Sequence, residues 1–321
     1  MLTCLRLILI IVIATFGPCC ALSQGYPTKP VRVLVGFGAG SPADILARAV
    51  STQLGSDFGQ QFYVENQTGA NSTIAIGTVV RASPDGYTLH FNLGSIAPIP
   101  YIYKSLRYDI LKDLIPIATV GILDGFLMVV HPAVPARTVT DFIAYAKKNH
   151  VVFGSPGVGS TPHLAAEIFK LKAGIDMSHV PFRGGGDASV ALLSKSIEMM
   201  FVSPSAVLDL VKSGDLRAIA LSGSRQHQEV PDVPLMKVYL PDYPINRSWG
   251  IYFAPASTPS EIIETLNVSI KKAVRAPAVA NVLQRIGYYP DERSSAQTAE
   301  FFRQEVEAAG EAVRAAKILP N

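Results

Sequence analysis

The sequence predicts an α/β protein of two domains with largely parallel sheets. Short apolar stretches alternate with segments of helical periodicity along the chain, which is the pattern of strand–helix–strand units. Several of the expected strands run into a glycine-rich turn and then into a helix. The length of 321 residues favours two domains of about 150 residues each.

The N-terminal part begins with a strand, a turn and a helix. Residues 31–37 predict the strand, and Leu46, Val50 and Leu54 place one apolar face on a helix over 41–58. Further strands are expected at 61–65, 87–93, 115–120 and 126–131, and a further helix at 72–82.

The rest of the chain continues the alternation. Thr138 and Asp141 have the spacing of a capping box, which predicts the start of a helix over 138–149. Residues 226–247 are rich in proline and show little periodicity, so they predict a connecting segment. Strands are expected at 151–154, 197–202, 217–221 and 251–254, and helices at 161–173, 185–194, 206–212, 259–274, 277–286 and 295–315.

The first 22 residues have the three-part layout of a secretory signal peptide. Arg6 precedes an apolar run over 7–16, and small residues follow. The run is shorter than the roughly 20 residues of a membrane-spanning helix. We therefore expect residues 1–23 to be a signal peptide, cleaved near Ala21–Ser23, and the mature protein to be periplasmic. An uncleaved anchor and a lipid-modified Cys20 are the alternatives.

Cysteine content and charge exclude several classes of protein. All three cysteines lie in the predicted signal peptide, so the mature chain would have no disulfide, reactive thiol or cysteine-ligated metal. A net charge of +3 without a basic run excludes a typical nucleic-acid binder. A hydrophobic content of 49% with 17% charged residues excludes intrinsic disorder. We expect no cofactor, no metal site and no nucleic-acid partner.

Three glycine-rich loops that each precede a helix are candidates for holding a small anion. Backbone N–H groups at the start of a helix attract anions, and glycine lets the backbone approach a ligand closely. The first loop has no Gly-Lys-Ser/Thr of a phosphate-binding P-loop, and a tight turn without a ligand is the alternative. Its candidate binding residues are Phe37, Gly38, Ala39, Gly40, Ser41 and Asp44.

The second loop gathers hydroxyl groups ahead of the 161–173 helix, and the third offers one cation ahead of the 185–194 helix. A packing or capping role for His163 and a surface ion pair for Arg183 are the alternatives. Serines that follow two other strands add hydroxyl donors. The candidate binding residues are Ser155, Gly159, Ser160, Thr161 and His163 in the second loop, Arg183 and Gly184 in the third, and Ser95, Ser203 and Ser205 elsewhere.

Enzyme signatures are weak, so we expect no catalytic residues and no enzyme activity. The chain has neither a Gly-x-Ser-x-Gly elbow nor a His-Glu-x-x-His motif. The six histidines show no metal-ligand spacing. An exported hydrolase that uses Ser160 as nucleophile and His163 as base is the alternative, although no acid is placed to orient the base.

Several motifs together resemble the Bug (Bordetella uptake gene) family, the extracytoplasmic solute-binding proteins of tripartite tricarboxylate transporters. They follow the family's order over essentially all of the mature chain. At 39–44 the chain departs from the family's Pro-Gly-Gly-Gly-Thr-Asp, since Pro42 removes an N–H group and Ala43 a hydroxyl. The motifs include Val64-Glu65-Asn66 with Gly69-Ala70, Pro84-Asp85-Gly86-Tyr87-Thr88-Leu89, Gly157-x-Gly159-Ser160, and His179-Val180-Pro181-Phe182-Arg183-Gly184.

The resemblance implies a type II periplasmic-binding fold, in which a ligand cleft separates two lobes. Residues 24–124 plus 247–321 would form lobe 1, and residues 125–246 would form lobe 2. The ligand would be a small organic carboxylate (a di- or tricarboxylate, an acidic amino acid or an aromatic acid), held by the loops at 38–44 and 155–161. The partners would be membrane permease subunits or, for a ligand sensor without transport, a sensor ectodomain. The receptor itself would be a monomer.

Overall fold

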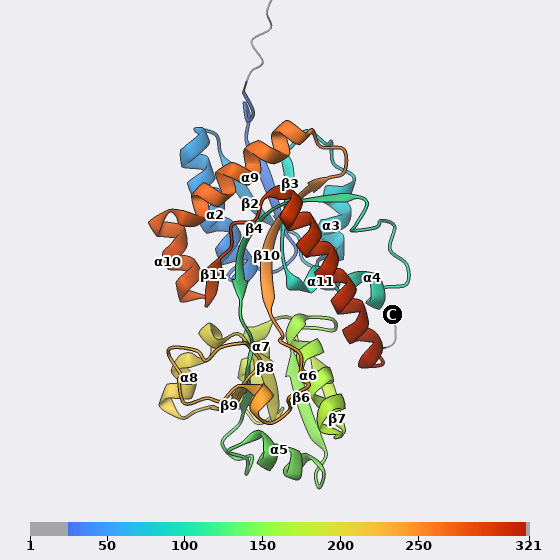
Figure 1. The fold of residues 1–321 in the computed structure, drawn as a ribbon, viewed down its shortest axis with the longest axis vertical. Coiled ribbons are helices and arrows are strands. Elements are labelled where there is room, and N and C mark those ends of the chain that lie inside the picture. Colours follow the sequence, from blue (N-terminus) through green and yellow to red (C-terminus); the bar gives the residue numbers. More distant parts are fainter. Residues whose placement is uncertain (1–24, 319–321) are drawn as a thin grey trace, which may run out of the picture.

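Two α/β lobes, one above the other in Figure 1, make up residues 25–318, the part of the chain that the computed structural model describes. The upper lobe contains a six-stranded sheet of order β11-β4-β10-β3-β1-β2, and the lower lobe a five-stranded sheet of order β7-β6-β8-β5-β9. The two-lobed α/β architecture is confirmed. The predicted signal peptide at 1–23 lies outside the described residues, and the exact lobe boundaries stay a prediction.

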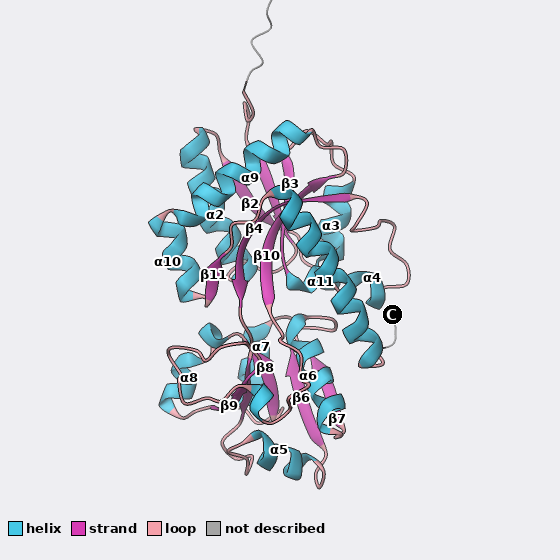
Figure 2. Ribbon diagram, in the orientation of Figure 1, coloured by secondary structure: helices cyan, strands magenta, loops and turns pink. Residues whose placement is uncertain are grey.

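The upper lobe takes its elements from both ends of the chain (Figure 2). Its strands are β1 (Val31–Val35), β2 (Phe62–Asn66), β3 (Thr88–Leu93), β4 (Leu114–Leu123), β10 (Ser248–Pro255) and β11 (Tyr288–Pro290). Its helices are α2 (Pro42–Phe58), α3 (Thr73–Val80), α4 (Ile99–Ile102), α9 (Ser260–Arg275), α10 (Pro277–Arg285) and α11 (Ser295–Ala315), with the 3-10 turns η1 (Ala70–Ser72) and η2 (Gly94–Ile96).

The lower lobe is one continuous stretch of chain. The expected capping box forms here, because Thr138 accepts the Asp141 N–H and Asp141 accepts the Thr138 N–H. The strands are β5 (Leu127–Val130), β6 (Val151–Ser155), β7 (Met177–Pro181), β8 (Met199–Val202) and β9 (Arg217–Leu221). The helices are α5 (Val139–Ala146), α6 (Thr161–Ala173), α7 (Gly185–Leu193) and α8 (Leu208–Ser213), with the 3-10 turns η3 (Pro204–Ala206) and η4 (Met236–Val238).

Both sheets are mixed, which corrects the expectation of largely parallel pairing. β1 pairs in parallel with β2 and β3, and β6 with β7 and β8. β10 instead runs antiparallel to β3 and β4, and β5 antiparallel to β8 and β9. The reason is the route of the chain: β4 leads out of the upper lobe and β10 returns into it, so the two strands run in opposite directions.

The sequence did not predict two short strands, β7 and β11, or the short helix α4. β7 contains Val180 and Pro181, which belong to the motif that leads into the third loop and for which no strand was expected. It is an edge strand with mostly exposed or half-buried residues, so it lacks the apolar run that marks a buried strand. The other two, α4 and β11, are each too short to show a periodicity.

Alternate residues of β1 pack into two apolar layers, one on each face of the upper sheet. Val33 packs in the layer that contains Leu46 of α2, and Leu34 packs in the layer that contains Ile76 of α3 and Phe253 of β10. All five side chains are fully buried. Successive side chains of a strand point to opposite faces of the sheet, so β1 packs against helices on both faces of the upper sheet. This packing holds the strand ends in place.

Helix α11 reaches from the upper lobe to the lower one (Figure 1). Val313 near its C-terminal end is buried in a small apolar cluster with Ile102 of α4 and Leu164 of α6. This cluster holds the start of α6 against the upper lobe. No helix within residues 25–318 is long and apolar enough to cross a membrane.

Two glycines pack backbone to backbone where the chain passes between the lobes. A Cβ on Gly223 would lie 2.2 Å from the Asp124 carbonyl oxygen, and one on Gly125, whose φ is +103°, would lie 2.3 Å from the Gly223 nitrogen. Next to them the Phe126 N–H donates to Ser222 Oγ over 2.9 Å. The outgoing chain after β4 is therefore fixed against the chain after β9.

Gly223→Ala is expected to lower the free energy of unfolding by about 1–3 kcal/mol, because its methyl group meets backbone rather than a flexible side chain. Urea denaturation measures this change. Gly186→Ala is the matched control, since its Cβ meets nothing within 4 Å and it lies inside α7. A Gly223→Ala protein as stable as the wild type would contradict the close packing of Gly223 against the Asp124 backbone.

Candidate functional site

The strand ends of the two lobes face each other and bring the predicted loops to one interface. β1 and β3 end toward the lower lobe, and β6 ends toward the upper lobe. A Cβ on Gly94 would lie 3.4 Å from Thr161 Oγ1, and one on Gly159 would lie 2.4 Å from Ile102 Cδ1. The second loop of the lower lobe is therefore in contact with the upper lobe.

The first loop is organised from within by Asp44, which is only 3% exposed. One carboxylate oxygen accepts the Gly40 N–H over 2.9 Å, and the other accepts from Arg48 Nε over 2.9 Å and Asn66 Nδ2 over 2.8 Å. Burial raises the pKa of Asp44, but these hydrogen bonds outweigh it and keep the pKa below its ordinary value. Because both oxygens already accept hydrogen bonds from the loop and from the elements next to it, Asp44 is a positioning residue.

The rest of the first loop presents backbone to the interface. Gly38, Ala39 and Gly40 are exposed, and Ser41 caps α2 by accepting the Asp44 N–H over 3.3 Å. Phe37 is half-buried against the upper core, and its carbonyl accepts from Asn66 Nδ2. Within residues 25–318, the N–H groups of Gly38, Ala39 and Ala43 have no acceptor.

The second loop is closed by its own side chains. Ser160 caps α6, where its Oγ accepts the His163 N–H over 3.4 Å and donates to the Gly157 carbonyl over 2.8 Å. Gly159 donates its N–H to His163 Nδ1 over 3.1 Å. The N–H groups of Val158 and Thr161 have no acceptor in the described part of the chain. Two backbone donors therefore remain here, as in the first loop.

His163 is held neutral beneath this loop. Burial, together with the nearby His179 and Lys170, lowers the pKa of His163 to about 3. Its ring lies 4.0 Å from that of His179, measured between centroids. Within residues 25–318 no hydrogen bond joins Ser160 Oγ to the His163 ring, so the pair lacks the contact between nucleophile and base that a hydrolase needs.

Ser155 is buried below the second loop and supports it. Its Oγ lies 2.7 Å from His179 Nε2 and donates to the Gly157 carbonyl over 3.0 Å. Burial lowers the pKa of His179 to about 4. Sequence reasoning did not include His179 in the site, although it stands in the motif that leads into the third loop. Its contact with Ser155 depends on the pairing of β6 with β7, which the sequence did not predict.

The third loop lies beside the second. The Phe182 N–H donates to the Ser155 carbonyl over 2.9 Å. Arg183 is exposed and has no ion pair within the described residues, which leaves its charge unneutralised. Gly184 precedes α7 without a side-chain cap. The loop therefore supplies an exposed cation beside the second loop.

The three serines outside the loops have separate surroundings. Ser95 is buried and donates to Asn92 Oδ1 over 3.2 Å. Ser203 Oγ and Ser205 Oγ lie 3.1 Å apart, and Ser205 donates to the Ile286 carbonyl of the upper lobe over 3.1 Å. Ser205 thus connects the lobes at the end of α10.

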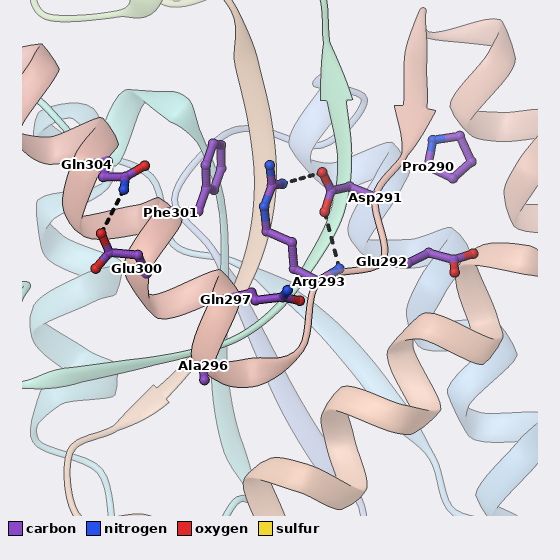
Figure 3. A pocket seen from close by; sticks show the side chains of 9 residues that line it. All are labelled: Pro290, Asp291, Glu292, Arg293, Ala296, Gln297, Glu300, Phe301 and Gln304. Carbon is purple, nitrogen blue, oxygen red and sulfur yellow. Dashed lines mark hydrogen bonds and ion pairs between the residues drawn. The ribbon is translucent and has the colours of Figure 1, made fainter.

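A separate groove lies on the upper lobe between β11 and α11 (Figure 3). Arg293 forms an ion pair with Asp291, and its guanidinium lies 4.0 Å from the centre of the Phe301 ring. Gln304 donates to Glu300 over 2.7 Å. These charged groups already have partners within the groove, so we place the candidate site at the loops between the lobes.

Residues 46–318 match the family model described as the tripartite tricarboxylate transporter family receptor. The chain belongs to this receptor family. Protein BugT of Bordetella pertussis is 31% identical over 304 residues, which cover 92% of each chain. The resemblance to the Bug family is thereby confirmed, and the chain is a solute-binding receptor.

Solved structures of receptors with the same fold carry small acids. The R. palustris protein Rpa4515, determined with adipate, aligns with a TM-score of 0.85 at 26% identity and covers 92% of this chain and 100% of its own. MatC from Rhodopseudomonas palustris, determined with bound malate, aligns with a TM-score of 0.81 at 26% identity and covers 90% of this chain and 100% of its own. The type II fold of the receptor is thus confirmed.

Asp44→Asn is expected to lower the free energy of unfolding by about 1–3 kcal/mol at pH 7, because the amide cannot accept from all three donors. The folded pKa of Asp44 lies below its ordinary value of 3.8, so the advantage of the wild type is complete well above pH 3.8. It disappears as the pH falls through the folded value. Denaturation curves at pH 7 and below pH 4 measure the difference.

Asp57→Asn is the control, since Asp57 lies on the same helix and its polar partners within residues 25–318 are Gln53 and the exposed Lys272. A surface pair of this kind contributes about 0–1 kcal/mol. Equal losses of unfolding free energy in the two variants, or a loss in Asp44→Asn that does not vary with pH, would contradict the role of Asp44 in holding the first loop.

Proposed function

We propose that this receptor captures a small organic carboxylate between its lobes and delivers it to the membrane subunits of a tripartite tricarboxylate transporter. One observation carries the proposal: both helix-start loops at the interface present backbone N–H groups without an acceptor among residues 25–318. These are Gly38, Ala39 and Ala43 on the upper lobe, and Val158 and Thr161 on the lower lobe.

A carboxylate suits these donors better than a neutral or cationic solute. The starts of α2 and α6 carry the positive ends of two helix dipoles, which stabilise a negative charge. The two oxygens of one carboxylate can accept from both lobes together. Rpa4515 and MatC, solved with adipate and malate, support the same class of ligand. Arg183, exposed beside the second loop, would attract a second carboxylate.

A ligand that contacts both lobes favours their closed arrangement, because only the closed state offers every contact. The crossings near Gly125 and Asn246 would act as the hinges. The closed receptor would then dock on the permease from the periplasm, after removal of residues 1–23. No chemistry on the ligand is proposed, since Ser160 Oγ and His163 Nδ1 form hydrogen bonds with the backbone of their own loop, and His163 Nε2 lies 3.8 Å from the Glu167 carboxylate rather than beside Ser160.

The first test is a ligand screen by thermal shift on protein that has been unfolded and refolded to remove any bound solute. Di- and tricarboxylates, acidic amino acids and aromatic acids form one set, and sugars and polyamines form the comparison set. A carboxylate at 100 times its dissociation constant is expected to add about 2.7 kcal/mol of stability. No stabilisation by any acid would contradict carboxylate capture.

A second test removes one proposed donor. Thr161→Pro deletes the N–H group at the first position of α6, where proline fits, and Ser160 already has the extended backbone that precedes proline. Because a hydrogen bond to a charged group contributes about 1.5–3 kcal/mol, this variant is expected to bind at least about tenfold more weakly. Thr161→Val keeps the N–H group and is expected to bind within about threefold of the wild type. Equal affinity of both variants would contradict the role of this donor.

A further inference from the structure

Three consecutive residues adopt the left-handed backbone conformation in η1, between β2 and α3. The φ angles are +44° at Ala70, +51° at Asn71 and +74° at Ser72. None of these residues is glycine, and such a conformation costs about 1–3 kcal/mol at a non-glycine residue. It persists only where the surroundings hold it.

Ser72 ties this run to the first loop. Its side chain is fully buried and accepts from Asn92 Nδ2 over 2.9 Å. A Cβ on Gly36 would lie 1.8 Å from Ser72 Oγ, so the residue that opens the first loop packs directly against Ser72. The run is therefore fixed at the base of the candidate site.

Asn71 lies where the two lobes meet. Its Nδ2 donates to the Ser95 carbonyl of the upper lobe over 3.2 Å. A Cβ on Gly159 of the lower lobe would lie 3.6 Å from the same nitrogen. The Asn71 side chain thus spans the interface beside the second loop.

The Ser95 carbonyl fixes the orientation of the Asn71 amide. A carbonyl oxygen only accepts hydrogen bonds, so the amide nitrogen must face it and Oδ1 must face away. Oδ1 accepts from no donor within the described residues, and it is not among their buried polar atoms that lack a partner. An accessible acceptor of fixed direction therefore lies beside the proposed carboxylate donors.

We propose that Asn71 is a specificity-determining residue that selects carboxylates with a hydroxyl or ammonium group next to the carboxylate. A bare carboxylate cannot donate to Asn71 Oδ1, whereas a hydroxyl or ammonium group can. The selection rests on the proposed function, since it needs a carboxylate at the two helix-start loops. The ligand would then need both a carboxylate and a neighbouring hydrogen-bond donor.

The test compares acids that differ only in this donor. Titration calorimetry measures dissociation constants for succinate, malate and aspartate, for propanoate and lactate, and for tricarballylate and citrate. In the series that binds, the wild type is expected to bind the acid with the donor about tenfold more tightly. In Asn71→Gly, which accepts a φ of +51° but has no amide, the preference is expected to fall below about threefold.

Ala70→Gly is the matched control, because it relieves the same backbone strain and keeps the Asn71 amide. It is expected to keep the tenfold preference, and both variants are expected to melt at or above the wild-type temperature. Equal affinity of the wild type for the acids with and without the donor, in every series that binds, overturns the inference and leaves carboxylate capture standing. An unchanged preference in Asn71→Gly does the same. Absence of binding by every acid, both in these series and in the thermal-shift screen, overturns the proposed function and the inference with it.

Discussion

The antiparallel pairing of β4 with β10 is the constraint on which the rest of the receptor depends. Chain that leaves the upper lobe along β4 returns along β10, and the close approach of Gly125 and Gly223 fixes its course between the lobes. The carboxyl ends of β1, β3 and β6 then face one another across the interface. Parallel strands bind ligands at these ends, so the pairing places the starts of α2 and α6 where a shared anion can reach both.

The first two loops at this interface are each supported by side chains that form hydrogen bonds with the backbone of the loop. Asp44 holds the first loop through Gly40, and Ser160 and His163 hold the second through Gly157 and Gly159. The side chains therefore set the shape of the site, and the backbone supplies its donors. Donors of fixed direction suit a receptor, because less conformational freedom is lost when the ligand binds.

Local sequence predicted most elements because their signals are local. The helix at 161–173 and the strand at 217–221 agree with the structure at both ends, and the three loops lie next to helix starts as expected. The mixed pairing was not predictable, since strand direction depends on the route between lobes. Ser205 bonds to a carbonyl of the opposite lobe, and Asn71 reaches the opposite lobe from a left-handed backbone conformation. Neither feature leaves a pattern in the sequence.

The most direct measurement is a crystal structure of the refolded receptor with its tightest-binding acid. The account predicts a carboxylate between the lobes, with oxygens within about 3.2 Å of backbone N–H groups from both the 38–43 and the 158–161 segments. An acid that contacts only one lobe, or that lies in the groove beside Arg293, would contradict it.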